Sequence, residues 1–141
     1  MKKILLVFVL VLVCSLSTSC TTTRGDWKYD DLPNDYSVWR TNSRRIILCH
    51  SYGTTASTIV DAYVSEIAYN NDYIFAKQVT VPEDSNKKID TSNPSYYILV
   101  VETDELYGPY TEDEFNNKCE ELEISEIPEW IKTTRLKNYV K

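Results

Sequence analysis

Short apolar runs separated by turn residues dominate the middle of the chain, a pattern typical of antiparallel β-strands. Strands are predicted over residues 36–41 and 44–52, with a turn at Asn42-Ser43 between them. The second run is apolar at both odd and even positions, so both of its faces should be buried and it should lie inside a sheet.

A hairpin is predicted next, with strands over residues 63–69 and 73–81. The residues between them, Asn70-Asn71-Asp72, tolerate the positive φ angles of a tight turn. A polar segment from Pro82 to Pro94 should form an exposed loop, and a further strand is expected over residues 96–101.

A short strand at Leu106-Tyr107 should follow, and Gly108-Pro109 is expected to end the strands. A helix is predicted to begin at Thr111, because Thr111 and Glu114 have the spacing of a capping box. Its apolar stripe should dock on the sheet, and Pro128 permits a further helical turn. The stripe consists of Phe115, Cys119 and Leu122. The predicted fold is α+β, an antiparallel meander of five to seven strands with one C-terminal helix packed on the sheet.

The N-terminus has the pattern of a secretory signal peptide. Two lysines follow Met1, residues 4–13 form an unbroken apolar run, and small residues lead to Cys20. The run is about half the roughly 20 residues that a membrane-spanning helix needs. The expected division is a signal peptide over residues 1–19, a tether over 20–26 and one globular domain over 27–141.

The segment Leu16-Ser17-Thr18-Ser19-Cys20 resembles the lipobox of bacterial lipoproteins, although Ser17 stands where that motif usually has Leu. The resemblance implies a diacylglyceryl thioether on Cys20, and so a lipid anchor in a membrane of the bacterial cell envelope. Thr21 rather than Asp after the cysteine implies the outer membrane, if the cell has one. The alternative is an ordinary signal peptide cut near Ser19.

The composition describes one small acidic domain: 141 residues, 43% hydrophobic, with a net charge of −6. So acidic a chain argues against a nucleic-acid partner. The three glycines are far apart, which excludes known phosphate-binding loops, and the single histidine, His50, excludes a zinc site built on several imidazoles. Neither a cofactor nor a metal is therefore expected.

Two cysteines, Cys49 and Cys119, remain as thiols after processing. In an oxidising compartment they could form a single disulfide. The equally weighted alternative is two buried, unpaired cysteines that pack as small apolar side chains.

No catalytic constellation emerges from the sequence. Cys49 and His50 are adjacent on a strand and so project to opposite faces, which excludes a thiol-imidazole dyad. Carboxylates are so abundant between Glu102 and Glu129 that a pair spaced for catalysis carries no information. We therefore expect a binding or structural module and not an enzyme. The eleven tyrosines suggest a contact surface for an unidentified protein or glycan, although tyrosine is also common in strands.

Two alternative functions remain open. An inhibitor or immunity protein could use the acidic segment from Glu112 to Glu129 to cover a basic envelope enzyme such as a muramidase. A carboxylate-dependent hydrolase would need two acids buried close together in a groove.

Six short motifs are spread over most of the processed chain: 32–36 (LPNDY), 63–65 (YVS), 71–74 (NDYI), 96–101 (YYILVV), 106–110 (LYGPY) and 111–115 (TEDEF). Together they resemble a family of small bacterial lipoproteins classed as a domain of unknown function. The motifs concern strand ends and a helix cap, so the resemblance implies the fold and no catalytic residues.

Overall fold

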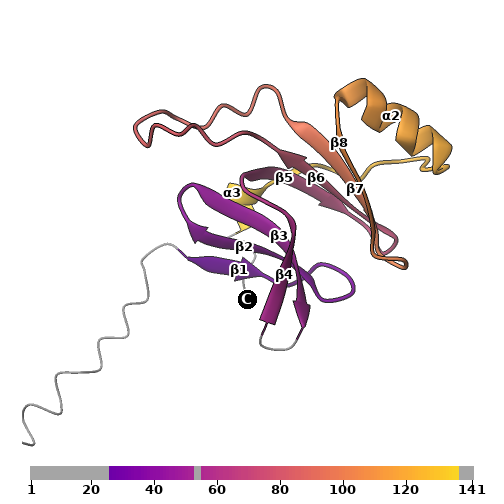
Figure 1. Cartoon of the computed structure of the whole chain (residues 1–141). Helices are drawn as coiled ribbons and strands as arrows, with labels where there is room; N and C mark the ends of the chain where they lie inside the picture. The colour runs from indigo at the N-terminus through magenta and orange to yellow at the C-terminus, as the bar shows by residue number, and fades with distance from the viewer. Residues whose placement is uncertain (1–25, 53–54, 137–141) are drawn as a thin grey trace, which may run out of the picture.

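The chain forms two antiparallel sheets that face each other, with one helix on the outer side of the second sheet (Figure 1). A computed structural model describes residues 26–52 and 55–136. The first sheet has the order β1-β2-β3-β4. Its strands are β1 (Trp27–Tyr29), β2 (Tyr36–Asn42), β3 (Arg45–Tyr52) and β4 (Thr55–Val60).

The second sheet has the order β8-β7-β6-β5-β9, so its consecutive strands β5 to β8 form a meander. Two helices complete the described residues, α2 (Glu112–Glu121) and the short α3 (Thr133–Leu136). The strands are β5 (Val64–Tyr69), β6 (Tyr73–Gln78), β7 (Ser95–Val100), β8 (Glu105–Tyr110) and β9 (Ile131–Lys132).

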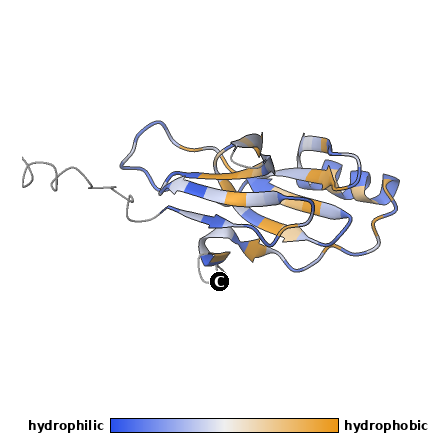
Figure 2. Ribbon diagram, turned by 90° about the horizontal axis from the view of Figure 1, so that it is seen from below, coloured by the Kyte–Doolittle hydropathy of each residue, from blue (hydrophilic) through white to orange (hydrophobic). Residues whose placement is uncertain are grey.

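The larger hydrophobic core lies between the two sheets. Val38 and Leu48 from the first sheet, Ile67 and Leu99 from the second and Leu136 from α3 are all at most 1% exposed there. The strands carry hydrophobic and hydrophilic residues in alternation along much of their length (Figure 2). Because successive side chains point to opposite faces, each sheet can turn one apolar face toward the other.

A second hydrophobic cluster joins α2 to the opposite face of the second sheet. Phe75 and Ile98 of the sheet pack there with Phe115 and Cys119 of the helix. The capping box predicted at the helix start is confirmed, since the Thr111 side chain accepts from the Glu114 N–H and the Glu114 carboxylate accepts from the Thr111 N–H. The second sheet is therefore covered on both faces.

Several local predictions are confirmed. β5 and β6 form the expected hairpin, and the Asn70 side chain accepts hydrogen bonds from the backbone N–H groups of Asp72 and Tyr73 in its turn. β3 is an interior strand with both faces buried, as its apolar pattern indicated. The coarse fold class, antiparallel β with a small helical content, is also confirmed.

The prediction of a single meander of five to seven strands is wrong, because the described residues contain nine strands in two sheets. The main omission is β4, whose sequence Thr-Ala-Ser-Thr-Ile-Val has neither alternation nor many large apolar residues. β4 forms an edge of the first sheet, and its first four residues are exposed. Its strand structure therefore comes from pairing with β3 and not from burial of its side chains.

Two boundary predictions are also wrong. Gly108-Pro109 lies inside β8, which is tolerated because β8 is an edge strand and proline lacks only a donor that an edge does not need. The turn of helix predicted after Pro128 is replaced by β9, where Ile131 pairs with Ile67 at the edge of the second sheet. A helical turn begins two residues later, at Thr133.

Within residues 26–52 and 55–136, no helix is long and apolar enough to cross a membrane.

Candidate functional site

A row of polar and aromatic side chains crosses all five strands of the second sheet. The antiparallel registers pair Tyr110 with Tyr96, Tyr96 with Lys77, Lys77 with Glu66, and Glu66 with Lys132. Tyr96 belongs to the hydrophobic cluster under α2. The row therefore begins beside that cluster and ends in charged groups at the β9 edge.

An ion pair occupies the centre of this row. The Lys77 Nζ lies 2.7 Å from the Glu66 Oε2, and the two side chains are only 18% and 23% exposed. The same ammonium lies 4.2 Å from the centre of the Trp130 ring and 5.6 Å from that of Tyr96. A half-buried ammonium loses water contacts, and the carboxylate and the aromatic faces compensate for that loss. Lys77 is thus held in place from three sides.

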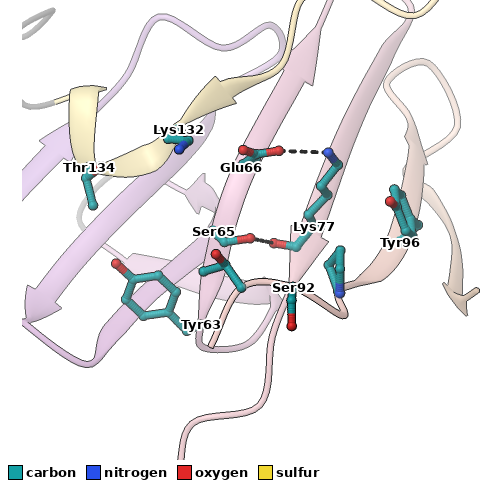
Figure 3. A pocket seen from close by; sticks show the side chains of 10 residues that line it. Tyr63, Ser65, Glu66, Lys77, Ser92, Tyr96, Lys132 and Thr134 are labelled. Carbon is teal, nitrogen blue, oxygen red and sulfur yellow. Dashed lines mark hydrogen bonds and ion pairs between the residues drawn. The ribbon is translucent and has the colours of Figure 1, made fainter. Parts of the chain in front are cut away.

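The ion pair forms part of the lining of a cavity of about 390 Å³ (Figure 3). Small-molecule sites usually have volumes of about 300–1,000 Å³, so this cavity has the size of a site for a small ligand. Its walls come from β5 and the residue before it, from β6, from β7 and the segment before it, and from β9 with α3. The lining residues are Tyr63, Ser65, Glu66, Lys77, Thr91, Ser92, Pro94, Tyr96, Lys132 and Thr134.

Hydrogen bonds fix the walls of this pocket. The Ser65 hydroxyl donates to the backbone carbonyl of Lys77 at 3.1 Å, as Figure 3 shows, and so ties β5 to β6. In the segment before β7, the Ser92 N–H donates to the Asp90 Oδ1 at 2.9 Å, and hydrogen bonds from the Ser92 backbone and side chain lower the pKa of the Asp90 carboxyl. Below the pocket, the Thr133 hydroxyl donates to the Val64 carbonyl at 2.8 Å. The site is thus built on paired strands and a braced loop.

The charge of the pocket is opposite in sign to that of the chain. Two lysines and one glutamate line it, whereas the chain as a whole carries −6. Glu66 stands opposite both lysines in register, yet its ion pair is with Lys77. Lys132 is exposed, and among the described residues it has no carboxylate within 4 Å of its ammonium. The pocket therefore offers one positive charge that no carboxylate of residues 26–52 or 55–136 neutralises.

The two cysteines considered for a disulfide are free thiols, buried in different parts of the structure. Cys49 lies in the first sheet, with its Sγ 3.4 Å from the Ser37 Oγ, and Cys119 lies in the cluster under α2. Burial raises the pKa of both thiols. The arrangement is that of the second alternative, in which each cysteine packs as a small apolar side chain. Cys20 and the predicted signal peptide lie outside the described residues.

His50 is part of an aromatic stack and not of a reactive pair. Its ring lies 4.3 Å from that of Tyr36 and 4.4 Å from that of Tyr52, measured between centroids. The Tyr36 hydroxyl donates to the Asp104 carboxylate, and burial together with this bond raises the pKa of Tyr36. Within the described ranges, no group of three or more His, Cys, Asp or Glu residues is placed to hold a metal ion.

The tyrosines among the described residues differ widely in exposure. Tyr29, Tyr36, Tyr63 and Tyr96 are at most 8% exposed, and the Tyr29 hydroxyl lies 2.5 Å from that of Tyr69. Tyr52 is 58% exposed, and five further described tyrosines are partly exposed. A contact surface made of tyrosines stays a prediction, and the pocket was not predicted from the sequence. The signal available was weak: Glu66 and Lys77 are charged residues inside otherwise apolar strands of the predicted hairpin.

The fold and site define a small two-sheet domain that carries a polar, hydroxyl-lined pocket at one end of its second sheet. A family model described as "Protein of unknown function (DUF3997)" matches residues 33–132, and the chain belongs to this family. The match includes every strand of the second sheet and most of the pocket lining. No curated protein and no solved structure matches the chain.

Proposed function

We propose that the protein is a lipid-anchored binding module of the bacterial cell envelope, which holds a small ligand in the pocket of its second sheet without transforming it. The observation that carries the binding role is the pocket itself, a cavity of about 390 Å³ with a fixed ion pair among its walls. Its rigid strands and braced loop favour recognition of a ligand in one orientation.

The chemistry of the lining supports binding over catalysis. General acid-base catalysis needs a group that exchanges a proton near the working pH. The Glu66 carboxylate is instead engaged in an ion pair with the Lys77 ammonium at 2.7 Å. The Ser65 hydroxyl donates to a backbone carbonyl and not to a base, so it is not arranged as a nucleophile.

The anchor rests on the sequence before the described residues. The two lysines after Met1, the short apolar run and the small residues before Cys20 match the processing pattern of lipoproteins. Two or three acyl chains hold a protein stably on a membrane, because each buried methylene contributes about 0.8 kcal/mol. The domain would then present its pocket close to the membrane surface.

The anchor is tested by growing cells with an alkyne-bearing palmitate analogue and separating membranes from soluble proteins. The wild-type chain should carry the label and sediment with membranes, whereas Cys20→Ser should be unlabelled and soluble. Cys49→Ser is the matched control, since it removes a thiol elsewhere, and should behave as wild type. An unlabelled, soluble wild-type chain would contradict the anchor and leave the pocket as the property of a secreted protein.

The inhibitor hypothesis is supported by one observation, the exposed acidic surface of α2. Glu112, Asp113, Glu120 and Glu121 are exposed there. Such a surface would bind a basic enzyme with a strong dependence on salt. Titration with a basic muramidase at low and at high salt tests it, and the absence of both inhibition and salt-sensitive binding would rule it out.

A further inference from the structure

The pocket is lined mainly by side chains that both donate and accept hydrogen bonds. Six of its ten lining residues carry a hydroxyl: Tyr63, Ser65, Thr91, Ser92, Tyr96 and Thr134. A hydroxyl can donate one hydrogen bond and accept others, and so can each hydroxyl of a polyol. The lining therefore matches a ligand rich in hydroxyl groups better than one made of apolar groups.

The groups already in place specify part of this match. The Ser65 proton is taken by the Lys77 carbonyl, so Ser65 can only accept from a ligand. One N–H of the Lys77 ammonium is directed at Glu66, and an ammonium has three N–H donors. Glu66 has a second carboxylate oxygen that can accept. The pocket thus offers both acceptors and donors to a ligand that carries several hydroxyls.

The charges limit the ligand to a small anionic group. Lys132 is exposed and has no carboxylate partner among the described residues, so it can receive a carboxylate from a ligand. A dianion such as phosphate fits less well, because Glu66 stands directly opposite Lys132 in register and would repel it.

Taken together, the geometry points to a sugar acid, that is, a saccharide unit with a single carboxylate, as the ligand of this pocket. This inference rests on the proposed binding function and specifies its ligand. The carboxylate would lie at Lys132, and the ring hydroxyls would contact Ser65, Lys77 and Glu66. Tyr63 and Tyr96 are each only 8% exposed, so hydrogen bonds rather than ring stacking would provide most of the contact.

The test compares two probes that differ at one carbon, methyl β-D-glucuronide and methyl β-D-glucoside. Each is titrated into the intact ¹⁵N-labelled protein, in neutral polyoxyethylene detergent, and amide shifts are followed by NMR. The glucuronide should shift the amides of Ser65, Ser92 and Lys132 at millimolar concentration. The glucoside should bind about fivefold more weakly, as expected when one exposed ion pair worth up to about 1 kcal/mol is lost.

Lys132→Gln should reduce glucuronide affinity to that of the glucoside and leave glucoside binding unchanged. Lys28→Gln is the matched control, because it removes one positive charge from the first sheet and should change neither affinity. Both lysines lie at exposed positions, so the amide spectra of both variants should retain the dispersion of the folded protein.

Three results would overturn the inference: equal binding of the two probes, equal losses in Lys28→Gln and Lys132→Gln, or shifts confined to residues outside the pocket. Acetate and inorganic phosphate are titrated as further probes. If either shifts the pocket amides while the sugars do not, the pocket binds ligands but the sugar acid is wrong. If no probe shifts the pocket amides, the assignment of the binding role to this pocket fails as well.

Discussion

Glu66 and Lys77 face each other across β5 and β6, with the carboxylate Oε2 2.7 Å from the ammonium Nζ. The pair marks the boundary between two environments. Trp130 and Tyr96 place aromatic faces against the ammonium, and the pair lines the polar pocket together with Tyr96. The pair thus connects the core under α2 with the candidate binding site.

The half-buried position of this pair predicts a measurable coupling. Glu66→Gln should lower the free energy of unfolding by about 1–2 kcal/mol, between the values typical of exposed and of buried pairs, because Lys77 would lose its charged partner. Urea unfolding of Glu66→Gln, Lys77→Gln and the double variant gives the interaction energy from a double-mutant cycle.

The control is the exposed pair of Arg45 and Asp61, whose side chains are 46% and 65% exposed at an N–O distance of 3.3 Å. The same cycle there should give about 0.5 kcal/mol or less. Equal coupling energies for the two pairs would contradict the prediction, because the surroundings of Lys77 would then add nothing to the interaction energy of the pair.

Gly108 should be intolerant of any side chain. Its φ is +119°, and a Cβ at this position would lie 2.5 Å from the Tyr96 carbonyl oxygen. Gly108→Ala should therefore lower the free energy of unfolding by about 1–3 kcal/mol or more, because both the backbone and the neighbouring strand are strained. Ser57→Ala on the exposed strand β4 should stay within about 0.5 kcal/mol. A Gly108→Ala chain as stable as wild type in urea would contradict the close approach of β8 to β7.

The local elements could be predicted from the sequence where one interaction decides them. The Asn70 turn and the Thr111 cap each depend on a few adjacent residues, and both are present in the structure. β4 could not be predicted, because its strand structure depends on pairing with β3. The sequence of β4 alone does not reveal that pairing. The pocket could not be predicted for the same reason, since its walls come from residues between 63 and 134 that meet only after the sheet forms.

The raised pKa of the Tyr36 hydroxyl predicts that stability decreases at alkaline pH. Burial and the bond to Asp104 raise the pKa of the Tyr36 hydroxyl above its usual value of about 10. In the unfolded chain this hydroxyl loses its proton near pH 10, while the folded chain keeps it, so stability falls as the pH rises above about 10. Tyr36→Phe should make this fall shallower.

At neutral pH the same substitution should cost about 1 kcal/mol, the usual net value of one hydrogen bond. Urea unfolding at pH 8 and at pH 11 measures both effects. Burial also raises the pKa of Tyr63 and Tyr97, so some alkaline destabilisation should persist in the variant. An identical decline in Tyr36→Phe and wild type would contradict the assignment to Tyr36.

The buried thiols should be unreactive in the folded protein. In a chain carrying Cys14→Ser and Cys20→Ser, only Cys49 and Cys119 remain, and both are buried with a raised pKa. A thiol reagent such as DTNB should react slowly under native conditions and titrate two thiols in guanidinium without reductant. Detection of two thiols only after reduction would instead establish the disulfide.

The anchor on Cys20 is the claim on which the envelope location of the binding module depends. Intact mass spectrometry of the protein extracted from native membranes tests it most directly. We expect a mass equal to the chain without residues 1–19, increased by a diacylglyceryl group and, where the amine is acylated, by one further acyl chain. A mass showing an unmodified Cys20 would contradict it and make this protein a secreted domain with no lipid anchor at that cysteine.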